Sequence, residues 1–177
     1  MLYTSRYDSP LGGILLAGDD EALTGLWFDG QKYFADTLPA QHAARETPVF
    51  DAAKRWLDVY FRGERPDFTP PVKWEATPFR SAVWEILVSV PYGTTVTYAE
   101  IASRIARQRG LAHMSAQAAG SAVAHNPISV IVPFHRVVGT DGSLTGYAGG
   151  IGKKLRLLEL ERVDTSRFFI PKKGTAL

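Results

Sequence analysis

The chain has 177 residues, of which 45% are apolar and 21% charged, which is enough for one ordinary domain or two small ones with a real core. It contains no cysteine, which excludes disulfides, thiolate metal ligands and a thiol nucleophile. The net charge is only +2, but residues 76–177 carry 12 Lys/Arg against 6 Asp/Glu, an excess that suits a polyanion-binding unit unless it is chance unevenness.

The first part of the chain predicts a small α/β unit. It begins without a basic region followed by an apolar run, and no segment reaches about 18 apolar residues, so we expect no signal peptide and no membrane span. Residues 2–30 predict two or three short strands separated by Gly-containing turns. Apolar residues recur at helical spacing over residues 48–63 and predict an amphipathic helix that Gly63 stops.

A proline-rich segment follows this unit. Residues 64–78 contain four prolines in 15 positions, which favours extended backbone and a linker. We therefore divide the chain into an N-terminal α/β domain, residues 1–75, with the linker at its end, and a C-terminal domain, residues 76–177.

Helix signals dominate the C-terminal domain. Thr77 is a cap residue followed by Pro78, the residue favoured at a first helical position. Thr97 and Glu100 have the spacing of a capping box, and Ser115 can cap a third helix. These signals predict three helices before residue 126.

The rest of the C-terminal domain predicts a short buried strand over residues 129–133, a turn and loop over 139–150, and a last helix over 152–163. Two helices joined by a short connection and followed by a small strand pair suggest a winged helix-turn-helix. The helix after Ser115 has no Lys or Arg and consists mostly of alanine and other small residues. Such a helix can approach DNA closely, or it can pack its alanines against a neighbouring helix.

Three stretches resemble one protein family: "TPFRSAVWEILVSVPYGTTVTYAEIA", "MSAQAAGSAV" and "NPISVIVPFHRVVGTDGSLTGYAGG". They closely resemble the methylated-DNA–protein-cysteine methyltransferases, also called O6-alkylguanine-DNA alkyltransferases, and the resemblance extends over essentially the whole chain. It implies a ribonuclease H-like α/β N-terminal domain and a mainly α winged helix-turn-helix C-terminal domain. Family members bind duplex DNA in the minor groove, flip the damaged guanine and transfer its O6-alkyl group to a cysteine, without a cofactor.

The chain departs from the family at the nucleophile. The family motif Pro-Cys-His-Arg-Val reads here Pro-Phe-His-Arg-Val, with Phe134 at the cysteine position. Alkyl transfer needs a thiolate, and a phenyl ring has neither a lone pair nor a titratable proton. We therefore expect no alkyl transfer, although the family is enzymatic.

Other family positions are retained. The resemblance makes His135 the histidine that deprotonates the cysteine, Glu161 the glutamate that orients it, and Asn126 the tie between recognition helix and active-site turn. Without the thiol, these relay positions are expected to be structural rather than catalytic. Arg136 is expected to be a structural salt-bridge residue.

The base-handling positions are retained too. By resemblance, Tyr98 helps rotate the target nucleotide, Gln117 fills the gap left in the base stack, and Tyr147 lines the base pocket. The DNA- or base-binding set is completed by further positions on the recognition helix, at the nucleophile site and in the loop: Ser115, Ala116, Gly120, Phe134 and Ala148. Ordinary half-buried packing is the alternative for the two tyrosines.

Three functions remain open. The first is a lesion-binding protein that resembles the alkyltransferase-like proteins, which have tryptophan at the cysteine position and mark O6-alkylguanine for nucleotide excision repair. The second is a true alkyltransferase whose cysteine was replaced, and the third is a general DNA-binding module whose pocket Phe134 plugs. For the first we expect a monomeric protein of the cytoplasm or nucleoid. Its partners would be duplex DNA containing O6-alkylguanine and nucleotide excision repair proteins, with no membrane, metal or cofactor.

Overall fold

A computed structural model describes residues 1–147 and 150–171. The chain divides into two compact units, one formed by Met1–Trp74 with Pro127–Ile131 and the other by Glu75–Asn126 with Val132–Leu177. Within the described ranges, no helix is both long enough and apolar enough to cross a membrane.

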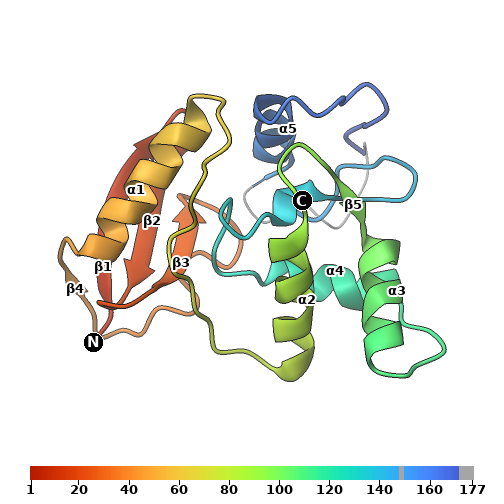
Figure 1. Cartoon of the computed structure of the whole chain (residues 1–177), viewed down its shortest axis with the longest axis horizontal. Coiled ribbons are helices and arrows are strands. Elements are labelled where there is room, and N and C mark those ends of the chain that lie inside the picture. Colours follow the sequence, from red (N-terminus) through yellow and green to blue (C-terminus); the bar gives the residue numbers. More distant parts are fainter. Residues whose placement is uncertain (148–149, 172–177) are drawn as a thin grey trace. The chain divides into compact units, whose positions relative to one another are not determined.

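The first unit is a four-stranded sheet with one helix packed on it (Figure 1). Its elements are β1 (Tyr3–Ser9), β2 (Gly12–Gly18), β3 (Leu23–Phe28), β4 (Ala43–Ala44) and α1 (Pro48–Phe61). The sheet order is β3-β2-β1-β4, with β1 antiparallel to β2, β2 antiparallel to β3, and β4 parallel to β1. The predicted helix is confirmed, and Thr47 caps it by accepting a hydrogen bond from the amide of Phe50.

The core of this unit follows from the alternation of its strands. Ile14 and Leu16 of β2 are fully buried and the residue between them is not, because successive side chains of a strand point to opposite faces. The strand β3 is instead buried almost throughout. Phe50, Leu57 and Tyr60 of α1 recur at helical spacing and are also fully buried.

The segment predicted as a strand over residues 129–133 is instead a buried turn, so that prediction was wrong. Pro127 O accepts from Leu26 N at 2.8 Å, and Ser129 N donates to Leu26 O at 3.0 Å, which attaches the segment to β3 by one isolated bridge. Val130 then takes a left-handed backbone conformation (φ +67°) that a β-branched residue rarely adopts and that cannot continue a strand.

The second unit is mainly helical (Figure 1). Its elements are α2 (Pro78–Ser89), β5 (Val96–Thr97), α3 (Tyr98–Gln108), α4 (Ala116–Ala124), the 3-10 turn η1 (Phe134–Arg136), β6 (Val137–Val138) and α5 (Ile151–Leu160). All three predicted caps are confirmed: Thr77, Thr97 and Ser115 each accept a backbone hydrogen bond, and Thr97 forms a complete capping box with Glu100. The strands β5 and β6 pair in parallel over two residues.

Small residues on α4 allow close packing within this unit. Ala119, Ala122 and Val123 are buried, and the indole Nε1 of Trp84 on α2 donates to Ala122 O at 2.8 Å. A second cluster joins α5 to the preceding loop through Val138, Leu144, Ile151 and Leu158. The first turn of α4 is not covered by this packing, and Ser115, Ala116 and Gln117 are exposed to solvent there.

Candidate functional site

The sequence-predicted nucleophile position lies on a single tight turn. Phe134, His135 and Arg136 form η1 directly after Pro133, and all three are buried, with exposed fractions of 1%, 0% and 7%. Phe134 N donates to Val132 O at 2.9 Å, and Arg136 N donates to Pro133 O at 3.1 Å. This turn places three consecutive side chains inside the second unit.

A buried carboxylate organises two of these side chains. His135 Nε2 lies 2.6 Å from Glu161 Oε2, and Arg136 contacts both oxygens of the carboxylate, with Nε at 2.8 Å and Nη2 at 3.2 Å. Gly93 N donates to the same carboxylate at 2.9 Å, and Arg136 Nη1 donates to Val90 O at 2.7 Å. A buried charge costs free energy unless it is paired, and these donors compensate the buried carboxylate of Glu161.

The protonation states follow from burial and charge. Burial lowers the pKa of His135 below its ordinary 6.5, although the Glu161 carboxylate partly opposes this, so the imidazole is neutral at neutral pH. Burial alone would raise the pKa of Glu161, but its hydrogen bonds and charge interactions with His135 and Arg136 outweigh burial and bring it to about 2. A neutral imidazole that donates through Nε2 carries its lone pair on Nδ1, the tautomer of a base.

The ring of Phe134 is packed against Tyr147. Their ring centroids are 4.5 Å apart with an interplanar angle of 42°, and each residue is only 1% exposed. Tyr147 also meets the imidazole of His135 edge-on, with centroids 6.5 Å apart. Position 134 therefore carries a buried phenyl ring packed against a tyrosine and has no nucleophilic atom.

The loop that carries Tyr147 is held by one carbonyl. Thr145 O accepts from Tyr98 Oη at 2.8 Å and from Lys154 Nζ at 2.7 Å. Gly146, at φ +80°, lies so close to Tyr98 that a Cβ there would be 2.5 Å from the hydroxyl, which explains why a glycine is required. Burial raises the pKa of Tyr98 and lowers the pKa of Lys154 to about 7.

The remaining predicted positions lie on or beside α4. Asn126 Nδ2 donates to Val132 O at 3.0 Å and thereby joins the end of α4 to the chain just ahead of η1. Gly120 faces Tyr98, since a Cβ added there would be 3.6 Å from the tyrosine ring. Ser115, Ala116 and Gln117 are on the exposed first turn, whereas Ala148 lies outside the described residues.

Sequence reasoning did not identify Lys154 or the Gly93 amide as parts of this site. Lys154 is fully buried on α5 between Ile151 and Leu158, in the row of positions that faces the core. The sequence does contain a signal for Lys154, because a lysine among the core-facing positions of an amphipathic helix is rare and indicates a buried partner. The Gly93 amide carries no such signal, because its contact depends on the tertiary structure alone.

Both parts of the chain are similar to known proteins. Residues 2–74 match the family model of the 6-O-methylguanine DNA methyltransferase ribonuclease-like domain, and residues 78–163 match that of its DNA binding domain. The methylated-DNA–protein-cysteine methyltransferase of Haemophilus influenzae is 39% identical over 163 residues, which cover 92% of this chain and 87% of the relative. Its namesake from Mycobacterium tuberculosis strain H37Rv is 41% identical over 162 residues, covering 92% and 93%. The crystal structure of Mycobacterium tuberculosis OGT in complex with DNA is similar with a TM-score of 0.76 and 41% identity, covering 94% of each chain.

Proposed function

The chain belongs to the 6-O-methylguanine DNA methyltransferase family, and we propose that it binds O6-alkylguanine in duplex DNA without transferring the alkyl group. The observation that carries this proposal is the buried ring of Phe134 on η1, beside His135 and its partner Glu161. The position that resembles the family nucleophile is thus built into the site but holds a side chain without nucleophilic chemistry.

The absence of transfer follows from the chemistry of the reaction. A displacement at the alkyl carbon needs a lone pair on the attacking atom, and the thiolate supplies one at neutral pH. The phenyl ring of Phe134 supplies none, and the 177 residues contain no cysteine at another position. The neutral imidazole of His135 then has no thiol to deprotonate, so its bond to Glu161 serves the structure of the turn.

DNA binding is assigned to the C-terminal domain, residues 76–177, as a winged helix-turn-helix formed around α3 and α4. Small residues on the exposed first turn of α4 support this, because they let the helix backbone lie close to the floor of a minor groove. The relative from Mycobacterium tuberculosis that is 41% identical has been crystallised in complex with DNA, which also supports it. In this arrangement Gln117 fills the gap that a flipped guanine leaves in the stack.

Base flipping would bring the guanine to Phe134 and Tyr147, and the family resemblance adds Tyr98 and Ala148 to the residues that bind it. Two aromatic rings in direct contact have centroids about 4.5–7 Å apart. At 4.5 Å the Phe134 and Tyr147 rings leave no room for a base between them. A base that stacks between these rings therefore requires them to separate, after which Phe134 becomes a stacking surface worth about 1–3 kcal/mol per base.

The burial of Phe134 favours a second candidate function. If the Tyr147 loop stays closed, the ring is a plug, and the chain is a DNA-binding module that does not distinguish O6-alkylguanine from guanine. For both functions we expect the chain to use the same DNA surface, to need no cofactor and to act inside the cell as a monomer. Recruitment of nucleotide excision repair proteins belongs to the lesion-binding function only.

A pair of duplexes that differ in one O6-methyl group separates these functions. We expect tighter binding to the O6-methylguanine duplex than to the guanine duplex in a fluorescence anisotropy titration, and an intact O6-methyl group after binding. Equal affinities would favour the plugged module. Loss of the O6-methyl group from DNA, with a matching mass increase of the protein, would refute the non-transferring function.

A further inference from the structure

We propose that a cationic surface on α3 and its connection to α4 binds the sugar–phosphate backbone of duplex DNA, next to the place where α4 enters the groove. The charges of this α3–α4 surface come from Arg104, Arg107 and Arg109, and His113 lies beside them as a polar side chain. The ligand, duplex DNA, is taken from the proposed function, while none of these four side chains belongs to the set that the family resemblance identifies.

The sequence around this surface has no negative charge. No Asp or Glu occurs between residues 101 and 140, a segment that contains four arginines. Arg136 is the one of the four that is buried and neutralised by Glu161. The other three are exposed, at the end of α3 and in the turn after it, and His113 is exposed a few residues later.

The three exposed arginines of this surface have no ion pair among the described residues, a state they share with Arg55 and Arg65 of the first unit. What distinguishes them is that the sequence around them, residues 101–140, contains no carboxylate. In the first unit, Arg6, Lys54 and Arg62 each form an ion pair at the surface. A solvated face of ordinary type mixes both signs, whereas uncompensated positive charge attracts a polyanion.

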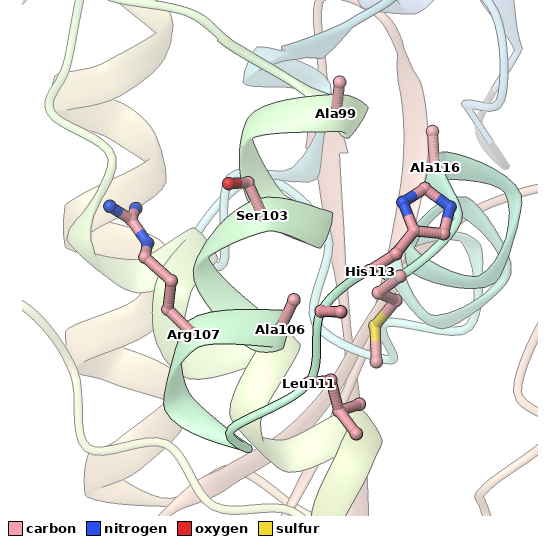
Figure 2. A pocket seen from close by; sticks show the side chains of 9 residues that line it. Ala99, Ser103, Ala106, Arg107, Leu111, His113 and Ala116 are labelled. Atoms are coloured by element: carbon pink, nitrogen blue, oxygen red, sulfur yellow. The ribbon is translucent and has the colours of Figure 1, made fainter.

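A surface pocket lies within this region. It is formed between one side of α3, at Ser103 and Ala106, and the connection that includes Leu111 and His113, and it reaches Ala116 at the start of α4 (Figure 2). Figure 2 shows Arg107 extending away from His113, so the guanidinium and the imidazole stand at different edges of the pocket. Small side chains between them leave room for a backbone strand to lie close to α3.

The composition of α4 makes such a neighbour necessary. Between Ala116 and Ala124 the helix has no Lys or Arg, so it cannot neutralise phosphates with its own side chains. Phosphate contacts provide most of the sequence-independent affinity of a DNA-binding protein. The α3–α4 surface is next to α4 in space, because Arg107 and His113 line the same pocket as Ala116.

The test compares two matched double variants. Arg104→Gln with Arg107→Gln removes two charges from the α3–α4 surface, and Arg55→Gln with Arg65→Gln removes two exposed charges from the first unit. Each variant and the wild-type chain are titrated with guanine and O6-methylguanine duplexes between about 50 and 200 mM salt, the range over which phosphate contacts dominate the change in affinity. A thermal melt of each variant verifies that it is folded.

The expected result is a smaller salt dependence for the α3 variant. Each lost phosphate contact lowers the slope of log affinity against log salt by about 0.9, so two contacts lower it by roughly 1.8. The affinity should fall by the same factor on both duplexes, while the Arg55/Arg65 control keeps the wild-type slope. A wild-type slope for the α3 variant, an equal loss in the control, or a loss confined to the O6-methylguanine duplex would overturn the inference. Failure of the wild-type chain to bind either duplex would instead refute the proposed function itself.

Discussion

Replacing Phe134 by alanine tests both the packing of the site and the role of the ring. The side chain is 1% exposed and its ring centroid is 4.5 Å from that of Tyr147, so truncation leaves a cavity that the turn η1 cannot easily close. Truncating a fully buried phenylalanine costs about 3–5 kcal/mol. For a chain of this size, each kcal/mol lowers Tm by about 2–4 °C, so we expect Phe134→Ala to lower Tm by roughly 6–20 °C.

Phe68→Ala is the matched control, because Phe68 is 37% exposed and its aromatic contact is with the guanidinium of Arg55, at 6.0 Å. We expect it to cost about 1 kcal/mol or less. Differential scanning calorimetry or a circular dichroism melt measures both variants. A Tm for Phe134→Ala equal to or above that of Phe68→Ala would refute the packing of the Phe134 ring against Tyr147.

The same variant assigns the role of the ring in DNA binding. If Phe134 is a stacking wall, its loss weakens binding to O6-methylguanine duplex by about tenfold, since 1.4 kcal/mol is one decade in affinity. If Phe134 is a plug, truncation opens the pocket and lesion binding improves. Binding to guanine duplex stays constant in both cases because phosphate contacts set it. Unchanged binding to both duplexes would show that the ring takes no part in lesion contact.

Three further predictions follow from the site. Phe134→Cys should restore some transfer of labelled methyl groups to protein because His135, Glu161 and Asn126 are in place, and the Phe134→Ser control should show none; a folded but inert cysteine variant would contradict this. Burial lowers the pKa of Lys154 to about 7 in the folded state, whereas in the unfolded state it has its ordinary value of 10.5. Between pH 7.5 and 9 the unfolded state therefore binds one proton more than the folded state. The free energy of unfolding should rise over this range by up to about 1.4 kcal/mol per pH unit. Urea unfolding should show that rise, and it should vanish in Lys154→Met; equal slopes would refute the buried charge. Thr97→Ala removes the half of the capping box in which the Thr97 hydroxyl accepts from Glu100 N, and it should cost about 0.5–2 kcal/mol in the same assay; a neutral effect would contradict the cap.

Local signals in the sequence predicted local structure well. The caps at Thr77, Thr97 and Ser115 were confirmed because a cap depends on residues within four positions of one another, which the sequence displays directly. The helix α1 was predicted for a similar reason, since its apolar spacing is a property of a single segment.

The failures involved positions whose conformation depends on distant parts of the chain. Residues 129–133 are apolar because they are buried, and burial alone does not distinguish a strand from a turn attached to β3 by one bridge. The identity of Phe134 was plain in the sequence, but its contact with Tyr147 depends on a loop that Tyr98 and Lys154 hold through Thr145. Such contacts are long-range, and no motif encodes them.

The central claim is that the chain holds alkylated DNA without reacting with it. The most direct measurement is a duplex with one O6-methylguanine that carries a radiolabelled methyl group, incubated with an excess of protein and divided between a native and a denaturing gel. We expect the label to move with a protein–DNA complex on the native gel and to return entirely to DNA on the denaturing gel. Label on the denatured protein, or a native complex no stronger than that of the guanine duplex, would contradict the account.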